Sequence, residues 1–403
     1  MSIFFHIDVN SAFLSWSALD LLENGHETDL RTIPSIVGGD TSTRHGVVLA
    51  KSIPAKVYNI QTGEPVVNAL RKCPNLMMVA PNHTMYQERS KAFIHYLLSL
   101  CPDIEQVSID ECFLDFTPIS NQYSSPIEAA TYIKDSILER FGFTVNVGIS
   151  DRKVLAKMAS DFKKPNLVHT LFSHEIPQKL WPLPVSDLFL CGHSSQETLH
   201  KLGILTIGDL AHADRNILQA HLKSHGLTLW EYANGIDDST IIPEPAKMKG
   251  VGNSTTLTKD VLTATGAYPV LLQLAESVAG RLRASHERAG MVSTEIKYAS
   301  FRSVSHQTTL QSPSASTDVI YQTACQLFDE LWDGSPIRLL GIRTSKLVTE
   351  DTPVQMSLFD YQANLPSGEK QQKLDSALDA LRTKYGKDII KRGSLLDSPK
   401  NTK

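Results

Sequence analysis

Cysteine is scarce and unpaired in this sequence of 403 residues. The five cysteines lie far apart and form no Cys-x-x-Cys pair, which argues against a disulfide framework or a zinc ribbon and fits a reducing compartment. No apolar run reaches the length of about 20 residues that a membrane span needs. The start, Met-Ser followed by a strand pattern, predicts no signal peptide. We therefore expect a cytoplasmic protein without a membrane partner.

A large excess of positive charge, the usual mark of a nucleic-acid surface, is also missing. The formal net charge is −4, but it is unevenly spread. Residues 1–245 contain 19 Lys and Arg against 27 Asp and Glu, whereas residues 246–403 contain 20 against 16. The C-terminal part is thus the better candidate for contact with a polyanion.

Two adjacent carboxylates interrupt an apolar, strand-like run. Asp110 and Glu111 lie within 107–116, where an unpaired buried carboxylate is costly and a divalent cation would offset the cost. Asp8 ends a second apolar strand, 3–7, so three carboxylates from two strands predict a magnesium site with room for phosphates. Neighbours on a regular strand point to opposite faces, so this site requires a turn or bulge between Asp110 and Glu111. The alternative is a salt-bridged strand end.

The remaining pattern predicts an α+β fold. We expect strands at 2–9, 104–116 and 144–149, and helices at 86–101, from Pro126 onward and at 153–163. A small helical unit at about 186–235 and a linker near 243–250 follow. Beyond the linker, strand 251–260, helix 266–289, strands 291–311, helix 316–332 and strand 336–348 give the β-α-β-β-α-β order of a split βαβ sandwich. An amphipathic segment covers roughly residues 371–391.

Five motifs occur in one order along the chain. They are Asp8 followed by Phe13, Arg44-x-Gly46-Val47, Pro54-Ala55-Lys56, Ser108-Ile109-Asp110-Glu111, and Lys153-x-Leu155-Ala156-Lys157-x-Ala159-Ser160-Asp161-x-x-Lys164-Pro165. Together they resemble the Y-family DNA polymerases, the translesion group that includes DNA polymerase IV (DinB) and UmuC. The similarity runs from Ile3 to about residue 360. Val9-Asn10 and Ala50-Lys51-Ser52 are closer to the UmuC side, so the sequence alone does not decide between the DinB and UmuC branches of the family.

The resemblance implies a right-hand polymerase of the α+β class, with a split βαβ palm, small fingers, a helical thumb and a β-α-β-β-α-β little finger. The palm would comprise 1–10 and 76–165, and the fingers 11–75. The thumb, with a helix-hairpin-helix-like motif, would span 166–243. The little finger would span 244–350, including a linker at 244–250, and a tail would follow at 351–403.

The resemblance also assigns the catalytic chemistry. Asp8, Asp110 and Glu111 would be catalytic residues and ligands of two Mg²⁺ ions per active site, with the main-chain carbonyl of Val9 as a further ligand. In the family the first and second aspartates bridge both ions, and the glutamate holds the ion that activates the primer terminus. Two such ions align the attacking 3′-hydroxyl and neutralise the charge that develops on pyrophosphate.

Three side chains would contact the incoming nucleotide. Lys157 and Lys56 are expected to bind triphosphate oxygens, because lysine is a compact point charge suited to phosphate. Phe13 would be the steric gate that excludes a 2′-hydroxyl. Relatives of the DinB type carry hydrogen-bond donors where this chain has Ala50 and Ile53. Either Lys51, Ser52 and main-chain amides replace those donors, or the affinity for triphosphate is lower.

Surfaces for larger partners lie further along the chain. Gly192 belongs to the thumb hairpin, which would present main-chain N–H groups to a DNA phosphate, although Leu190 replaces the first hairpin glycine. The candidate phosphate contacts of the little finger are basic: Arg281, Arg283, Arg302, Arg338, Arg343 and Lys346. The tail motif of Gln355, Met356, Ser357, Leu358 and Phe359 resembles a sliding-clamp peptide, with apolar anchors that would enter pockets on the clamp.

We therefore predict an error-prone, DNA-templated DNA polymerase of the translesion type. It would transfer nucleotides from deoxynucleoside triphosphates to a primer 3′-hydroxyl, acting as a monomer on primer-template DNA with a sliding clamp. Two alternatives remain open on the sequence. One is a catalytically inactive DNA-binding scaffold in damage tolerance, and the other is a two-metal nuclease or cyclase on a related sandwich.

Overall fold

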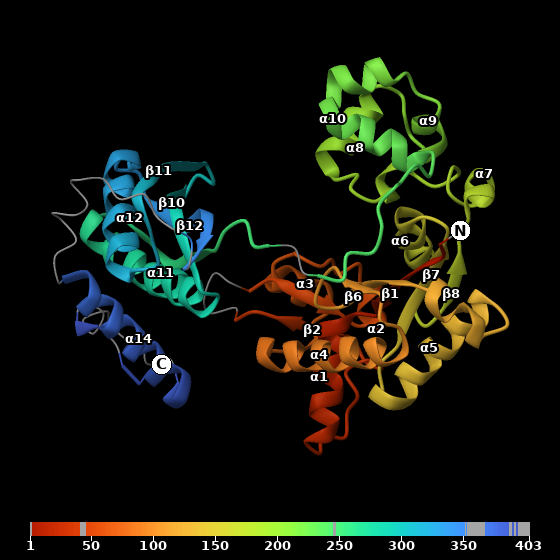
Figure 1. Cartoon of the computed structure of the whole chain (residues 1–403), viewed down its shortest axis with the longest axis horizontal. Coiled ribbons are helices and arrows are strands. Elements are labelled where there is room, and N and C mark those ends of the chain that lie inside the picture. The colour runs from red at the N-terminus through yellow and green to blue at the C-terminus, as the bar shows by residue number, and fades with distance from the viewer. Residues whose placement is uncertain are drawn as a thin grey trace. The chain divides into compact units, whose positions relative to one another are not determined.

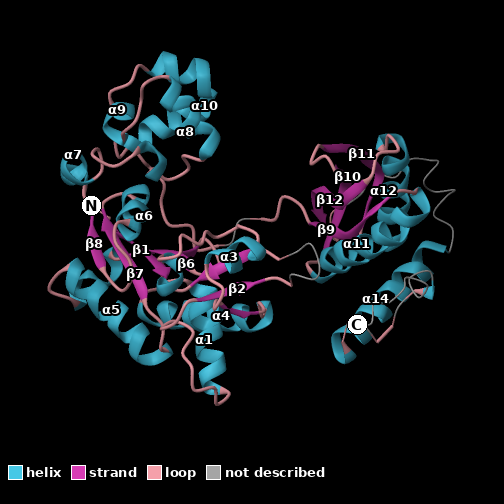
Figure 2. Cartoon of the chain, turned by 180° about the vertical axis from the view of Figure 1, so that it is seen from behind, coloured by secondary structure: helices cyan, strands magenta, loops and turns pink. Residues whose placement is uncertain are grey.

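The chain folds into two compact units that succeed each other at Pro245 (Figure 1). The computed structural model describes residues 2–40, 46–244, 247–350, 352, 367–386, 389–390 and 392–393. Among these residues, no helix is both long and apolar enough to cross a membrane. Each unit combines helices with an antiparallel or mixed sheet, as the α+β prediction requires (Figure 2).

A five-stranded sheet forms the centre of the first unit. Its strands are β1 (Phe4–Val9), β5 (Ile104–Gln106), β6 (Glu111–Asp115), β7 (Val145–Ser150) and β8 (Val168–Thr170), in the order β5-β6-β1-β7-β8. Both β6 and β7 run antiparallel to β1. They are therefore parallel to each other with β1 between them, and helix α5 (Pro126–Phe141) connects them. This is the predicted split βαβ palm.

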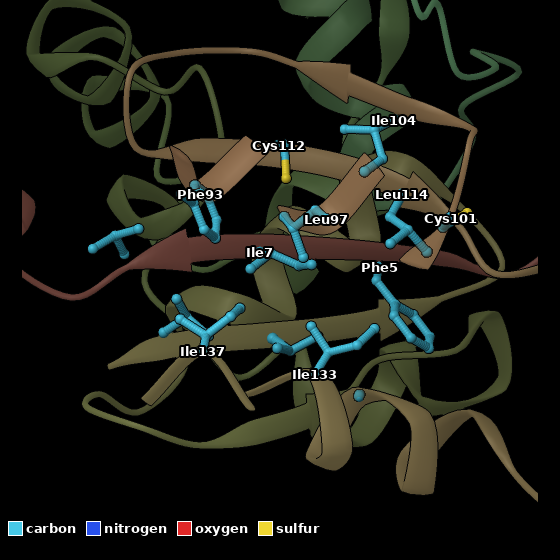
Figure 3. Close-up of a cluster of buried hydrophobic side chains, with 14 of the residues drawn as sticks. Phe5, Ile7, Phe93, Leu97, Cys101, Ile104, Cys112, Leu114, Ile133 and Ile137 are labelled. Atoms are coloured by element: carbon cyan, nitrogen blue, oxygen red, sulfur yellow. The ribbon is translucent and has the colours of Figure 1, made fainter. Parts of the chain in front are cut away.

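The alternation of side chains along β1 divides the sheet into two faces. Phe5 and Ile7 point into an apolar core with residues of α5 and of α4 (His83–Leu100) (Figure 3). His6 and Asp8 point to the opposite face, where His6 contacts Ser160 of α6 (Lys153–Asp161). One face of β1 thus builds the core, and the other presents polar groups to α6.

The acidic segment is a hairpin and not the single strand that we predicted over 104–116. β5 ends at Gln106 and β6 begins at Glu111, so residues 107–110 form the turn between them. The main-chain N–H groups of Val107 and Ser108 both donate to the Glu111 carbonyl, at 3.1 and 3.2 Å. These bonds close the turn and place Asp110 just outside the strand.

Two smaller parts complete the first unit. The predicted fingers, 11–75, contain the helices α1 (Ala12–Glu23), α2 (Ile53–Lys56) and α3 (Val66–Lys72) and the strands β2 (Ser35–Gly38) and β3 (Val48–Lys51). Their sheet has the order β3-β2-β4, and its third strand, β4 (Met77–Val79), lies just past the predicted limit of the fingers. The predicted thumb is helical: α7 (Ile176–Lys179), α8 (His193–Lys201), α9 (Ile207–Ala211) and α10 (Arg215–Ala233). Its core also contains Leu155 and Met158 of α6, which ties the thumb to the palm.

The second unit has the predicted β-α-β-β-α-β order. Its elements are β9 (Gly252–Val261), α11 (Ala264–Ala284), β10 (Glu287–Tyr298), β11 (Ser303–Ser314), α12 (Thr317–Leu331) and β12 (Ile337–Thr349), with the sheet order β11-β10-β12-β9. Along β10, Val292, Thr294 and Ile296 are buried against the helices. The alternate residues, including Ser293 and Glu295, lie on the other face of the sheet, where they line a polar hollow of about 680 Å³.

A further helix, α14 (Ser367–Tyr385), packs on α11. Ion pairs fix it there: Arg283 Nε contacts Asp379 Oδ2 at 2.6 Å, and Arg382 Nη2 contacts Glu276 Oε1 at 3.1 Å. Asp375, only 2% exposed, faces Arg283 as well. Within the amphipathic segment that we predicted at 371–391, the helical part up to Tyr385 is thus docked on the protein's own second unit.

Candidate active site

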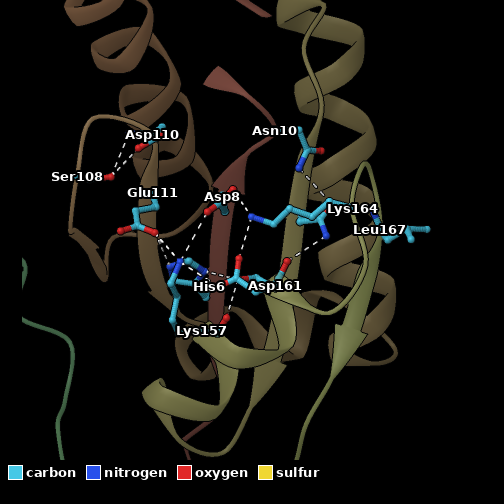
Figure 4. Close-up of polar contacts among 12 residues, drawn as sticks. His6, Asp8, Asn10, Ser108, Asp110, Glu111, Lys157, Asp161, Lys164 and Leu167 are labelled. Atoms are coloured by element: carbon cyan, nitrogen blue, oxygen red, sulfur yellow. Dashed lines mark hydrogen bonds and ion pairs between the residues drawn. The ribbon is translucent and has the colours of Figure 1, made fainter. Parts of the chain in front are cut away.

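The register of the palm sheet sets Asp8 directly opposite Glu111 on neighbouring antiparallel strands (Figure 4). Residues in such a pair share one face, with Cβ atoms roughly 4.5–5.5 Å apart, and like charges at this position repel each other. Two residues that are 103 positions apart in sequence therefore form an acidic pair on the α6 side. Their closeness needs a compensating positive charge.

Asp110 joins this pair from the hairpin turn. Its main-chain carbonyl accepts a hydrogen bond from the Val9 N–H at 3.0 Å, and its carboxylate accepts one from the Ser108 hydroxyl at 2.7 Å. Burial, together with the nearby charges of Asp8 and Glu111, raises the pKa of Asp110 above its ordinary value despite the Ser108 bond. The turn that the sequence argument required between Asp110 and Glu111 is present at Asp110.

Two lysines provide the positive charge in this structure. Lys157 Nζ lies 2.8 Å from Glu111 Oε2 and 3.7 Å from Asp8 Oδ2. Lys164 Nζ lies 2.8 Å from Asp8 Oδ1 and 2.9 Å from Asp161 Oδ1. Burial alone would lower the pKa of both lysines, but their carboxylate partners raise it above the ordinary value. Both ammonium groups therefore stay charged and neutralise the acidic pair.

His6 completes the cluster beneath Glu111. The contact with His6 and the ion pair with Lys157 lower the pKa of Glu111 to about 2, against the opposing effect of burial. His6 itself is fully buried, and burial lowers its pKa. Glu111 is consequently a carboxylate at neutral pH.

Helix α6 reaches these carboxylates because Gly148 lets it approach the sheet. Gly148 lies on β7 opposite His6. A Cβ atom at this position would lie 2.0 Å from the Ala156 carbonyl oxygen and 2.4 Å from the Ser160 nitrogen. Only glycine leaves room for this contact, so the close approach that carries Lys157 and Ser160 into the site depends on Gly148.

The residue types of the cluster fit a hard divalent cation. Carboxylate oxygens, with a main-chain carbonyl such as that of Val9, are the ligands that Mg²⁺ prefers. Across the described ranges, however, no three acidic, histidine or cysteine side chains lie close enough together to hold one ion. The structure thus gathers Asp8, Asp110 and Glu111 at one end of the sheet, with lysine ammonium groups as their counter-charges.

The predicted nucleotide contacts have distinct surroundings. Phe13 lies near the start of α1, partly buried, with its ring stacked on Tyr86 at a centroid distance of 4.6 Å. Lys56 ends α2 and is exposed. Lys51 donates to the carbonyl of Ile60, and Ser52 caps α2, so neither side chain is free to replace the donors that are absent at positions 50 and 53.

The thumb hairpin keeps its backbone shape without its first glycine. Leu190 adopts a positive φ of 68°, a conformation that costs a non-glycine residue roughly 1–2 kcal/mol. Gly192 is the N-cap of α8, and the space around a Cβ atom there is open to 4 Å. The main-chain N–H groups at the start of α8 are therefore approachable from solvent.

The six basic residues predicted to contact DNA do not share one surface. Arg343 is exposed on the helix-free face of the second-unit sheet, and Arg302 pairs with Asp333 at the β10–β11 side. Arg338 stacks on Phe301, Lys346 bonds to Thr309, and Arg281 donates to the Gly252 carbonyl. Arg283 is bound by the carboxylates of α14, so its guanidinium is already paired within the second unit.

The predicted clamp motif, Gln355, Met356, Leu358 and Phe359, lies outside the described residues.

Sequence reasoning missed two members of the cluster. Lys164 stood in the last of the five motifs but received no role, because its contact with Asp8 crosses 156 positions of sequence. His6 was overlooked although its place two residues before Asp8 puts both side chains on the same face of β1. The two-residue spacing between His6 and Asp8 was therefore the sequence signal that could have identified His6.

Similarity to known proteins identifies the family of this chain. The sequence profile of the impB/mucB/samB family matches residues 7–161, and the profile of that family's C-terminal domain matches 248–358. DNA polymerase IV of Clostridium acetobutylicum is 45% identical over 98% of both chains. DNA polymerase IV 1 of Bacillus subtilis is 35% identical over 98% of this chain and 93% of its own.

A solved structure has the same fold. The Y-family DNA polymerase chimera Dbh-Dpo4(243-245)-Dbh superposes with a TM-score of 0.77 at 22% identity, and the match covers 86% of this chain and 99% of the chimera. The choice between the DinB and UmuC branches, which the sequence motifs left open, is resolved toward DinB, because both relatives named above are DNA polymerases IV. The chain belongs to the impB/mucB/samB family and is a DinB-like, Y-family translesion DNA polymerase.

Proposed function

We propose that Asp8, Asp110 and Glu111 form the catalytic centre of this polymerase and hold two Mg²⁺ ions during nucleotidyl transfer. The observation that carries the proposal is the register of β1 and β6, which sets Asp8 opposite Glu111 with Asp110 beside them. Lys157 and Lys164 compensate the charge of Asp8 and Glu111 in the structure, and carboxylates gathered in this way are the ligand type that Mg²⁺ prefers. Bound there, Mg²⁺ would lower the pKa of the primer 3′-hydroxyl and stabilise the pyrophosphate that leaves.

The surrounding residues would prepare this centre. Lys157 holds Glu111 through a 2.8 Å contact, and its ammonium group would bind triphosphate oxygens when the nucleotide arrives. Phe13, partly buried against Tyr86, has a fixed ring plane and would exclude a ribose 2′-hydroxyl. Lys56 would be a further phosphate contact. Lys51 and Ser52 already make hydrogen bonds within the fingers, so either main-chain amides replace the two missing donors or the affinity for triphosphate is lower than in relatives that carry them.

DNA and nucleotides are the substrates of a DNA polymerase, and we propose where this chain contacts them. The open start of α8 at Gly192 would bind a DNA phosphate. In the second unit, Arg343, with Arg281, Arg302, Arg338 and Lys346 as further candidates, would contact phosphates without reading bases. We also propose a monomer in the cytoplasm that recruits a sliding clamp through Gln355, Met356, Leu358 and Phe359.

Primer extension in Mg²⁺ tests the catalytic assignment. Asp110→Asn should reduce extension by about 10²–10³-fold or more, the scale on which a stabiliser of transition-state charge acts, while DNA binding is retained. Asp115→Asn is the control, because Asp115 ends β6, the strand that follows Asp110, and lies opposite Phe4 at the far end of β1. Equal activity of the two variants would refute the assignment. Degradation of the primer, or DNA binding by the wild-type protein without synthesis, would instead support one of the two alternative functions.

A further inference from the structure

A buried histidine lies directly beneath the proposed metal-binding carboxylate. His6 has 0% exposure, and its ring is enclosed by the sheet, by α6 and by Phe113, whose ring meets it edge-on at 4.7 Å. His6 Nδ1 lies 2.7 Å from the Ser160 hydroxyl. His6 Nε2 makes no full hydrogen bond, and it faces Glu111 Oε2 at 3.4 Å (Figure 4). A buried nitrogen without a full hydrogen bond needs an explanation.

The two neighbours of the ring determine which nitrogen carries its proton. Burial disfavours the charged ring, so a single N–H is present. The Glu111 carboxylate can only accept a hydrogen bond, and the N–H therefore belongs on Nε2. Nδ1 must then accept. The Ser160 hydroxyl lies 2.7 Å from Nδ1 and 2.8 Å from the Lys157 carbonyl, and in this tautomer its single proton points to Nδ1. In that orientation Ser160 on α6 supports the tautomer that points a donor at Glu111.

The contacts on Glu111 are also arranged for a ligand. Lys157 and His6 both approach Oε2, at 2.8 and 3.4 Å. Among the described residues, no hydrogen bond or ion pair reaches Oε1. Hydrogen bonds at catalytic groups are often long before substrates bind and shorten in the working complex. One oxygen of Glu111 is therefore held from beneath, and the other is left for a cation.

We propose that His6, oriented by Ser160, is a positioning residue that fixes the Glu111 carboxylate for metal binding through Nε2–H. This inference depends on the metal role proposed for Glu111. His6 does not touch the substrate, and no change in its protonation is involved. Loss of such an outer partner typically costs about 10–100-fold in metal affinity or activity.

The test compares His6→Phe with His6→Gln in the full chain. Phenylalanine keeps a ring against Phe113 but removes both nitrogens, whereas the glutamine amide can restore a donor near the place of Nε2. Two quantities are measured: the Mg²⁺ concentration for half-maximal primer extension, and the Mn²⁺ affinity by electron paramagnetic resonance with a dideoxy-terminated primer and nucleotide. The second reports binding where no chemistry takes place.

We expect His6→Phe to raise the Mg²⁺ concentration for half-maximal extension, and to lower the Mn²⁺ affinity, by about 10-fold or more each. The nucleotide KM at saturating Mg²⁺ should stay close to that of the wild type. His6→Gln should recover most of the loss. Wild-type metal dependence in His6→Phe would overturn the proposal. So would equal defects in the Phe and Gln variants, which would indicate packing alone. Neither result would affect the catalytic assignment, which the Asp110→Asn comparison tests separately.

Ser160→Ala provides an independent variant that removes only one buried hydroxyl. It should weaken Mn²⁺ binding when His6 is present and have no further effect in the His6→Phe background, because both residues act through one contact. Ser150→Ala is the matched control: Ser150 is also buried and is a strand neighbour of Phe4, but its hydroxyl donates to Leu171. Additive effects of Ser160→Ala and His6→Phe, or an equal effect of Ser150→Ala, would contradict the proposal.

Discussion

Replacing Gly148 with alanine should disrupt the active site without touching any residue proposed to act in catalysis. The new Cβ atom would lie 2.0 Å from the Ala156 carbonyl oxygen and 2.4 Å from the Ser160 nitrogen. Non-bonded atoms rest near 3.5 Å, so α6 must move away from the sheet by roughly 1 Å or more. Both obstacles are main-chain atoms of the helix, and no side chain can rotate to relieve them.

Two effects should follow from this displacement. Overpacking of this kind costs about 1–3 kcal/mol of unfolding free energy, or more. Lys157 and Ser160 would move with α6, away from Glu111 and His6, and misplacement by about 1 Å can lower an enzymatic rate by roughly 10²-fold. The measurements are thermal unfolding and single-nucleotide primer extension at a temperature where the variant is folded.

The same substitution at Gly280 is a control that should act in the opposite direction. Gly280 lies inside α11, and an added Cβ atom there would meet its nearest neighbour, Asp379 Oδ1, at an ordinary 3.6 Å. Alanine within a helix stabilises by about 0.5–1 kcal/mol relative to glycine. Wild-type stability and extension in Gly148→Ala would refute the view that the position of α6 depends on this glycine.

Three further predictions concern the gate, the pH dependence and the tail. Phe13→Ala should raise ribonucleotide incorporation by about 10–10²-fold with deoxynucleotide insertion retained, and unchanged sugar discrimination would rule out the gate. Ser108→Ala removes a donor to the ionised Asp110 and should raise its pKa further. Because metal binding needs the carboxylate, the acid limb of the pH–rate profile should move to higher pH, and a shift to lower pH would contradict this sign. Replacing Leu358 and Phe359 with alanine should abolish stimulation by a sliding clamp and spare basal synthesis; loss of both activities would mean that these residues stabilise the fold.

Local patterns were sufficient to predict most elements. A mostly apolar run located β1, and alternation of apolar and polar residues located β7. Ser125 with Pro126 located the start of α5, where the Ser125 side chain accepts from the Glu128 N–H as an N-cap does. The hairpin at 107–110 was missed because Val107 and Ile109 continue the apolar run of the flanking strands. Their side chains look like strand residues in sequence, whereas the backbone turns there. Sequence pattern alone does not register such a turn when no glycine or proline marks it.

The site was predictable only in part, because some of its residues gain their role only from contacts that the fold creates. The carboxylates could be identified because acidic residues are unexpected in apolar strands. Lys164 and His6 carry no such signal, since a lysine after a helix and a histidine in a strand both have ordinary structural roles. Their significance comes from contacts with Asp8 and Glu111 that only the folded sheet creates. Arg283 shows the converse: a basic helix residue suggested DNA, but the fold pairs it with Asp379.

The docking of α14 limits how far a partner of the tail motif could be from the second unit. Residues 350–366, which include the Gln355–Phe359 motif, connect β12 to α14, and both of these elements belong to the same unit. Seventeen residues of chain span at most about 56–61 Å, so chain length alone limits the distance between the motif and these two elements. A clamp bound there would share a small volume with the second unit, at a high effective concentration. Removing the contacts of Arg283 with Asp375 and Asp379 together with that of Arg382 with Glu276 would weaken the attachment of α14 and loosen this limit.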